Sequence, residues 1–213
     1  EMLRSLVGSE MCIRDSLYGL STDSLAFDTI YFNASQQAEK ILLSSGIIAN
    51  DKPFQEAFDI MLNGDVEADK LNATIEYLNG KKECGVNIGM TAGLQKEGIS
   101  LHINPFDPTL VYRKFMVNPD NYIYLRDDGR IMANLSIHDD MRTGISLYST
   151  PDSTAQQDLT LALSQINIGE FKRVIPYMPD ISGVINAEAH YVQTNGTDMI
   201  SLENSIDQLA YNG

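Results

Sequence analysis

The chain has 213 residues, a formal net charge of −14 and 43% hydrophobic residues. An acidic surface repels phosphate backbones, so nucleic-acid binding is not expected. The apolar fraction is too high for a disordered chain, and the sequence contains no uncharged apolar run as long as a membrane helix requires.

Residues 1–16 differ in kind from the rest of the sequence. They match the translation of a transposase adapter used in short-read sequencing libraries, joined to an index, so we expect this segment to be non-native. We expect 17–213 to be a fragment of one repetitive β domain, truncated at both ends. Without Cys12, the sequence retains Cys84 alone, so no disulfide is expected within this part.

From residue 27 onward, apolar and polar residues alternate, which is the period of strands with one apolar and one wet face. The alternation predicts strands at 27–32, 71–77, 86–92, 99–103, 131–138, 145–147, 159–164 and 185–192. Turn-forming dipeptides lie between the apolar runs: Asn63-Gly64, Asn79-Gly80, Asp128-Gly129, Asp139-Asp140, Pro151-Asp152 and Asn195-Gly196. Short connections favour antiparallel neighbours, so we predict an all-β antiparallel meander.

Two segments have helical spacing. In 53–63 the apolar residues recur at both helical and strand periods, so periodicity leaves the choice open. The strands predicted around this segment favour a strand. Near 169–178, Phe171 and Val174 share one helical face, and Pro176 limits the segment to about two turns. We therefore predict one short helix there.

Residues that carry chemistry are scattered along the sequence. His102, His138 and His190 have no partner motif, and the first two fall on the polar side of their predicted strands, so we expect surface histidines. Asp127-Asp128 and Asp139-Asp140 adjoin turn residues, where aspartate is favoured for backbone reasons, and lack the spacing of a calcium loop. We predict a protein without catalytic activity, metal or cofactor.

Two segments resemble the repeated unit of TamB-like proteins. In 166–187 an apolar strand end is followed by a short helix, a proline-bounded turn and a strand that starts with Ser182-Gly183. Segments 106–115 and 118–125 resemble the version of this unit found in Gram-negative gut bacteria. The resemblance extends over 27–213, which is nearly all of the part expected to be native.

TamB-like proteins are similar to AsmA-type bridge proteins, in which a long sheet curls into an open, apolar trough that spans the periplasm. The resemblance implies an elongated, curled antiparallel sheet that carries phospholipid between the inner and outer membranes, or assists outer-membrane protein assembly. It also implies a periplasmic location, an inner-membrane anchor in the parent protein and an outer-membrane barrel partner of the TamA type. Two acyl chains of about sixteen carbons face a cost of about 25 kcal/mol in water, which an apolar lining removes.

The candidate residues for contact with lipid are the apolar members of the alternating strands. They are Ile75, Tyr77, Val86, Ile88, Met90, Ile99, Leu101, Ile103, Ile131, Leu135, Ile137, Leu159, Leu161, Leu163 and Ile185. A basic cluster at 112–115 contains Arg113 and Lys114. It could hold a phosphate headgroup at the edge of the groove, or discourage pairing of an edge strand with other sheets.

Two other classes of protein fit parts of the pattern. Alternating strands also build closed cores, so a structural or adhesive solenoid or sandwich module of the cell envelope is the first alternative. A carbohydrate-processing β protein is the second, and it would require convergent carboxylates that the sequence does not reveal. Retention of phospholipid distinguishes an open trough from a packed module.

Overall fold

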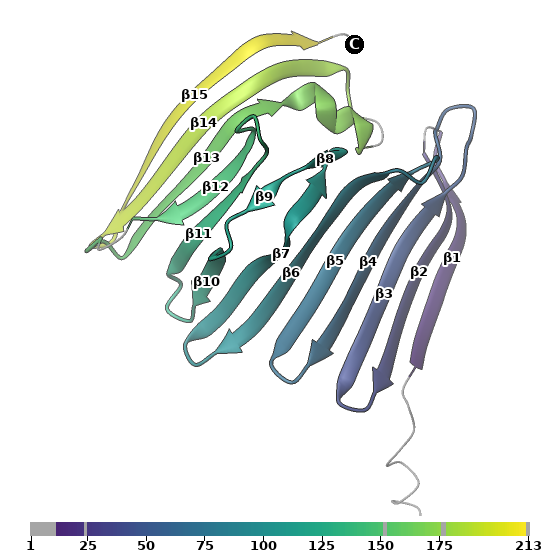
Figure 1. The fold of residues 1–213 in the computed structure, drawn as a ribbon, viewed down its shortest axis with the longest axis horizontal. Helices are drawn as coiled ribbons and strands as arrows, with labels where there is room; N and C mark the ends of the chain where they lie inside the picture. Colours follow the sequence, from purple (N-terminus) through teal and green to yellow (C-terminus); the bar gives the residue numbers. More distant parts are fainter. Residues whose placement is uncertain (1–11, 24, 151–152, 176–177, 212–213) are drawn as a thin grey trace, which may run out of the picture. The chain divides into compact units, whose positions relative to one another are not determined.

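The computed structural model describes residues 12–23, 25–150, 153–175 and 178–211. The fold is all-β, with an antiparallel sheet that is not closed and one short helix in the described residues, as predicted (Figure 1). The chain divides into two compact units, Glu1–Cys84 and Gly85–Gly213, which we call unit 1 and unit 2.

Unit 1 consists of strands that pair in chain order. They are β1 (Cys12–Ser21), β2 (Ala26–Gln37), β3 (Lys40–Ala49), β4 (Phe58–Glu67) and β5 (Lys70–Asn79). All neighbouring pairs are antiparallel. Strand β1 includes Cys12 to Ser16 of the segment expected to be non-native, and Asp15 lies opposite Phe32. The origin of that segment stays a prediction.

Unit 2 contains the remaining strands and the helix. They are β6 (Cys84–Gln95), β7 (Gly98–Leu110), β8 (Arg113–Lys114), β9 (Met116–Val117), β10 (Tyr122–Arg126), β11 (Ile131–His138), β12 (Gly144–Ser149), β13 (Gln157–Asn167), η1 (Ile168–Arg173), β14 (Ile181–Thr194) and β15 (Thr197–Tyr211). The strand order is β6-β7-β10-β11-β12-β13-β14-β15. Strand β8 pairs with β7, and β9 pairs with β11 beside the shorter β10.

Two asparagine side chains supply hydrogen bonds to the sheet at the irregular segment between β9 and β10. Asn121 is 2% exposed; its Oδ1 accepts the Ile103 N–H at 2.7 Å, and its Nδ2 donates to the Ile103 carbonyl at 3.1 Å. On the other side, Asn118 accepts the Ser136 N–H at 2.8 Å and donates to the Asn134 carbonyl at 3.1 Å. The amides thus replace backbone hydrogen bonds that the irregular segment does not make.

Each predicted strand lies within an observed strand, but details of the turns and the helix differ. Asn195-Gly196 forms the predicted turn with positive φ angles of 49° and 74°. The hairpin predicted at Asn63-Gly64 is wrong, because these residues lie within β4 and pair with both β3 and β5. The turn predicted at 151–152 lies outside the described residues.

Only one of the two segments with helical spacing forms a helix. Segment 53–63 is a strand only from Phe58, and the residues before it form a loop with an isolated bridge between Lys52 and Gln55. The short helix is a 3₁₀ helix that begins at Ile168 and ends at Arg173, so the predicted range near 169–178 is too long. The residue before a proline avoids the helical conformation, which favours this early end. Residues 176–177 lie outside the described residues.

Candidate functional site: an open apolar sheet face

The strand register of unit 1 gathers apolar side chains on one face. Residues opposite each other in paired strands share a face, and the face alternates along each strand. Leu17, Ile30, Ile47, Ile60 and Tyr77 therefore form one row across all five strands. We call this face the apolar face of unit 1. Its apolar members are Ile13, Leu17, Ile30, Phe32, Ala34, Ile41, Leu43, Ile47, Ala49, Phe58, Ile60, Leu62, Val66, Leu71, Ala73, Ile75 and Tyr77.

The opposite face of unit 1 is mainly polar. Arg14, Asn33, Ser44, Asn63 and Thr74 form a row there. Ion pairs of Lys40 with Asp65 and Glu67, at 3.5 and 3.0 Å, lie on the same face. Unit 1 is thus an amphipathic sheet, with most of its charged side chains on one side and most of its apolar side chains on the other.

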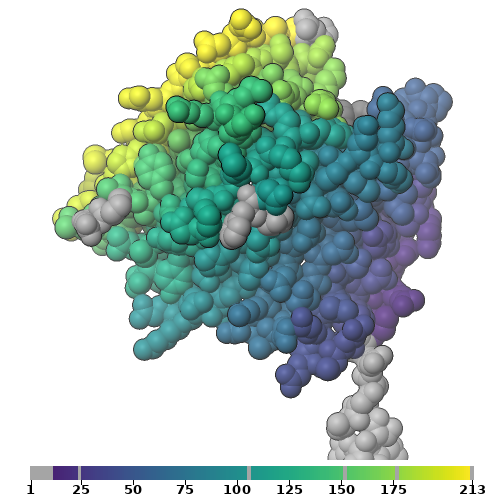
Figure 2. Space-filling model, in the orientation of Figure 1, coloured from purple at the N-terminus to yellow at the C-terminus, as the bar shows by residue number. Residues whose placement is uncertain are grey.

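The apolar face of unit 1 remains accessible to solvent. Leu62 is 49% exposed, and Phe32 and Ile75, on the same face, are also exposed. Among the described residues of unit 1, no second layer of strands or helices covers the sheet. Figure 2 shows one side of the molecule, with the strands of unit 1 in purple and blue. Sheets in folded domains normally bury such a face against another layer. An uncovered apolar face is therefore the candidate site.

Aromatic rings pack together at one end of unit 1: Phe58 and Tyr77 belong to the apolar face, whereas the register places Phe27 on the opposite face. The ring of Phe58, which is buried, stacks on Tyr77 with centroids 6.1 Å apart and meets Phe27 edge-on at 6.4 Å. These contacts join β2, β4 and β5, so the sheet is held by neighbours within one layer. Aromatic pairs of this kind stabilise a fold beyond the area that they bury.

Unit 2 also has an apolar face. Leu135, Leu147, Leu161, Ala189 and Leu202 form one row from β11 to β15. We call this face the apolar face of unit 2. Its apolar members are Val86, Ile88, Met90, Ala92, Leu94, Ile99, Leu101, Ile103, Ile123, Leu125, Ile131, Ala133, Leu135, Ile137, Ile145, Leu147, Leu159, Leu161, Leu163, Ile185, Ala187, Ala189, Tyr191, Ile200, Leu202 and Ile206.

The structure places every candidate for lipid contact on one of these two faces. Ile75 and Tyr77 lie on the apolar face of unit 1, and the other candidates lie on that of unit 2. Sequence periodicity was sufficient to assign these residues to one side of each sheet. Contact between these residues and lipid stays a prediction.

Part of the apolar face of unit 2 is packed by the chain itself. Val117 of β9 lies opposite Ile137, and both belong to a buried cluster with Phe115 and Leu135. Leu135 and Ile137 are each 9% exposed, so they offer little surface to a ligand. Leu161 on the same face is 41% exposed. The accessible part of this face therefore lies away from β9.

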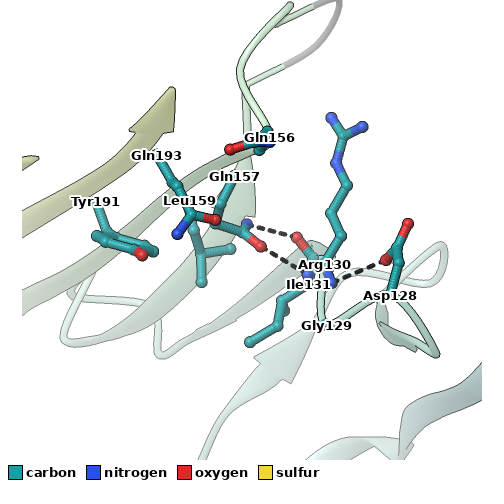
Figure 3. Close-up of a pocket in the computed structure, with 9 residues that line it drawn as sticks. All are labelled: Asp128, Gly129, Arg130, Ile131, Gln156, Gln157, Leu159, Tyr191 and Gln193. Carbon is teal, nitrogen blue, oxygen red and sulfur yellow. Dashed lines mark hydrogen bonds between the residues drawn. The ribbon is translucent and has the colours of Figure 1, made fainter. Parts of the chain in front are cut away.

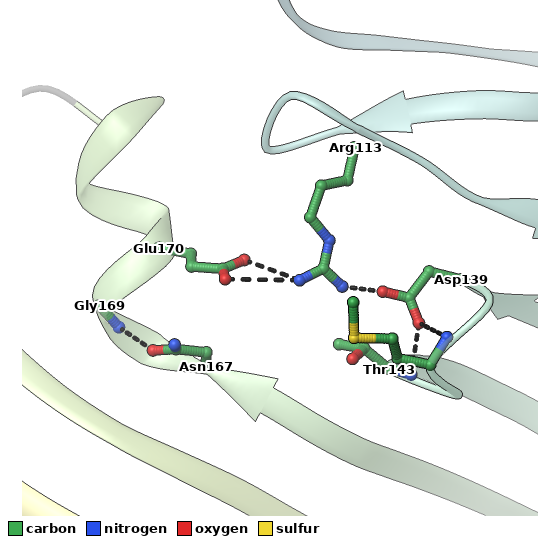
Figure 4. A network of polar contacts seen from close by, with 7 residues as sticks. Arg113, Asp139, Thr143, Asn167, Gly169 and Glu170 are labelled. Carbon is green, nitrogen blue, oxygen red and sulfur yellow. Dashed lines mark hydrogen bonds and ion pairs between the residues drawn. The ribbon is translucent and has the colours of Figure 1, made fainter.

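A charged network lies beside the buried cluster (Figure 4). The Arg113 guanidinium contacts Asp139 and, at 3.3 Å, the carboxylate of Glu170 in η1, and it lies over the Phe115 ring at 5.7 Å. The buried Asp139 also accepts the Thr143 backbone N–H at 2.8 Å. Two carboxylates thus neutralise Arg113, which does not favour a phosphate site at 112–115. The network instead joins η1 to the strands.

The three histidines contact different partners. His102 Nδ1 lies 2.6 Å from the Asn121 carbonyl oxygen, and His138 Nδ1 lies 2.8 Å from the hydroxyl of Ser136. His190 Nε2 lies 2.8 Å from Asp158. In the part of the chain that the structure describes, no group of three or more histidine, cysteine, aspartate or glutamate residues could hold a metal ion.

A cavity of about 620 Å³ lies at the end of the apolar face of unit 2 (Figure 3). It is lined by Asp128, Gly129, Arg130, Ile131, Gln156, Gln157, Leu159, Tyr191 and Gln193. The Gln157 side chain accepts the Ile131 N–H and donates to the Ile131 carbonyl, both at 2.7 Å, and so connects β13 to β11. The spacing of residues along the chain does not reveal this cavity. The sequence feature that could have indicated it is the polar Gln157, which falls on the same side of an alternating strand as Leu159 and Leu161.

No family model, curated protein or solved structure matches this chain. None of the described helices is long and apolar enough to cross a membrane.

Proposed function

We propose that the open apolar faces hold phospholipid acyl chains. The supporting observation is that Leu62, which lies opposite Ile75 on the apolar face of unit 1, and Leu161, which lies in the row from Leu135 to Leu202 on that of unit 2, are 49% and 41% exposed. An acyl chain laid along such a row leaves water at a gain of about 0.8 kcal/mol per CH₂. This function requires apolar surface and no chemical step.

The same proposal concerns the parent protein. The chain is a segment of a periplasmic bridge that is anchored in the inner membrane and carries phospholipid to the outer membrane. Its outer-membrane partner is a barrel protein of the TamA type. The resemblance of 106–125 and 166–187 to TamB-like proteins supports this assignment. Assistance to outer-membrane protein assembly would use the same faces, because an unfolded membrane strand also exposes apolar side chains.

A structural or adhesive module of the cell envelope is the second candidate. The observation in its favour is the cluster of Phe115, Val117, Leu135 and Ile137, which is packed like the core of an ordinary domain. Such a module would not retain lipid. The two candidates therefore differ in a property that can be measured directly.

Phospholipid retention by the whole chain tests the proposal. The 213-residue chain would be produced in the periplasm of a Gram-negative host, and bound phospholipid would be quantified by mass spectrometry after purification. Leu62→Asn and Leu161→Asn are expected to lower the bound phospholipid by about three- to tenfold, because each removes accessible apolar surface.

The matched control is Ile48→Asn. Ile48 is 38% exposed, like the test residues, but lies on the polar face of unit 1, opposite Asp59. Its substitution should leave lipid retention unchanged. A chain that purifies without phospholipid, or an equal loss in all three variants, would support the structural module.

A further inference from the structure

The apolar face of unit 2 becomes polar where β13 begins, at Gln157. Leu163, Leu161, Leu159 and Gln157 follow one another on the same face of this strand, and Gln157 lies opposite Gln193 of β14. The row before this pair is Leu159 with Tyr191. The surface therefore changes from aliphatic to polar within one row. A bound amphiphile would place its polar part at this end.

The cavity occupies this boundary (Figure 3). Its walls combine the apolar Ile131 and Leu159 with the polar Arg130, Gln156 and Gln193. A volume of about 620 Å³ is within the range of sites for small ligands. Mixed walls of this kind suit the region of a lipid where the acyl chains meet the headgroup.

The Asp128 carboxyl in the cavity wall has a lowered pKa, first because it accepts the Arg130 backbone N–H and also because of the positive charges of Arg126 and Arg130. The Asp128 carboxylate accepts hydrogen bonds from Arg126 Nε at 3.1 Å and from the Arg130 backbone N–H at 3.0 Å. The side chains of Tyr191 and Gln193 donate to Asp198 at 3.0 and 2.8 Å. Within the described ranges, no ion pair contains the Arg130 guanidinium. Arg113, by contrast, is already neutralised by two carboxylates.

We infer that this cavity binds the phosphate of a phospholipid headgroup, with Arg130 as the cation. A guanidinium presents several N–H donors in one plane and so matches two oxygens of a phosphodiester. Leu159 and Ile131 then contact the first carbons of the acyl chains. The inference rests on the proposed function and assigns the orientation of the lipid on the apolar face.

Calorimetric titration of the whole chain with two lipids tests the assignment. The probes are dihexanoylphosphatidylglycerol and dihexanoylglycerol, which share acyl chains and differ in the phosphate-containing headgroup. Arg130→Gln is expected to raise the Kd of the phospholipid by about tenfold and to leave that of dihexanoylglycerol unchanged. Arg130→Lys should give a smaller increase, because it keeps the charge and loses the planar donors.

Two controls separate the possible outcomes. Lys81→Gln removes one positive charge from an exposed turn of unit 1 and should change neither Kd. Inorganic phosphate should bind far more weakly than the phospholipid; equal affinity would overturn the assignment to a lipid headgroup. Equal effects of Arg130→Gln on both lipids, or no effect on either, would also overturn it while the acyl-binding function stands. Failure of the unaltered chain to bind either lipid would contradict the proposed function itself.

Discussion

At the scale of single residues, polar side chains complete the sheet where its strands fall short. Asn121 bonds to both backbone groups of Ile103, and Gln157 does the same for Ile131. Each amide has one donor side and one acceptor side, which is the pattern of a backbone peptide. These two residues therefore fix the positions of β10 and β11 without an additional strand, and Gln157 also shapes the cavity.

Asp158 is the residue for which we predict an effect of pH. Hydrogen bonds from Thr150 at 2.6 Å, His190 at 2.8 Å and Ser153 at 2.7 Å lower its pKa to about 2. A depressed carboxyl pKa stabilises the fold above the unfolded value of 3.8, and this contribution is lost as the pH falls towards 2. Asp158→Asn should therefore lower the free energy of unfolding by about 1–2 kcal/mol at pH 7.

Urea unfolding followed by circular dichroism at pH 7, 4 and 2 measures this effect. The difference between the unaltered chain and Asp158→Asn should shrink between pH 4 and pH 2, because the native carboxylate becomes protonated there. Asp140→Asn, which removes an exposed carboxylate, serves as the control. A constant difference across the three pH values would contradict the role assigned to Asp158.

At the scale of elements, the link between η1 and the strands depends on one buried carboxylate. Both partners of Arg113 are acidic, but the Asp139 side chain is buried whereas that of Glu170 is about one-third exposed. Asp139→Asn should lower the free energy of unfolding by about 2–3 kcal/mol, because it leaves part of a buried network unpaired. Glu170→Gln should cost about 0.5 kcal/mol. Denaturant titration of both variants measures these losses. Equal losses would contradict the prediction that Asp139 contributes more to stability than Glu170.

The elements also show what the sequence could predict. Strands with strict alternation, such as Ile131–His138, were predictable, and so was the side on which their apolar residues lie. Strand β3 was not predicted, because Leu42 and Ile48 are apolar residues on the polar face and interrupt the alternation. The hairpin at Asn63-Gly64 was wrong because pairing with strands on both sides outweighs the local turn preference.

The candidate site also has a part that the sequence predicts and a part that it does not. Its apolar rows follow from local periodicity, so sequence analysis was sufficient for them. The cavity depends on the pairing of Gln157 with Gln193 and on the position of Arg130 at the start of β11. These residues come together through the register of three separate strands, which the spacing along the chain does not determine. For the same reason, the sequence does not predict that Leu135 is buried in the cluster with Phe115.

At the scale of the whole molecule, each unit is a sheet with an apolar side, part of which the Phe115 cluster packs in unit 2. Strands β1 and β15 are each paired with one neighbour, β2 and β14, and are exposed along their described lengths. Large exposed apolar surfaces are uncommon on proteins without a partner, so we interpret these faces as candidate interaction sites. Acyl chains are the partner that we propose, because they require continuous apolar contact and no fixed hydrogen bonds.

Photocrosslinking in living cells tests this central claim most directly. A photoreactive amino acid would replace Leu62 or Leu161 on the apolar faces, and Ile48 or Met199 on the opposite faces, where all four side chains are exposed. Our account predicts phospholipid adducts, detected by mass spectrometry, at positions 62 and 161 and none at 48 and 199. Adducts at all four positions to the same extent, or at none of them, would contradict it.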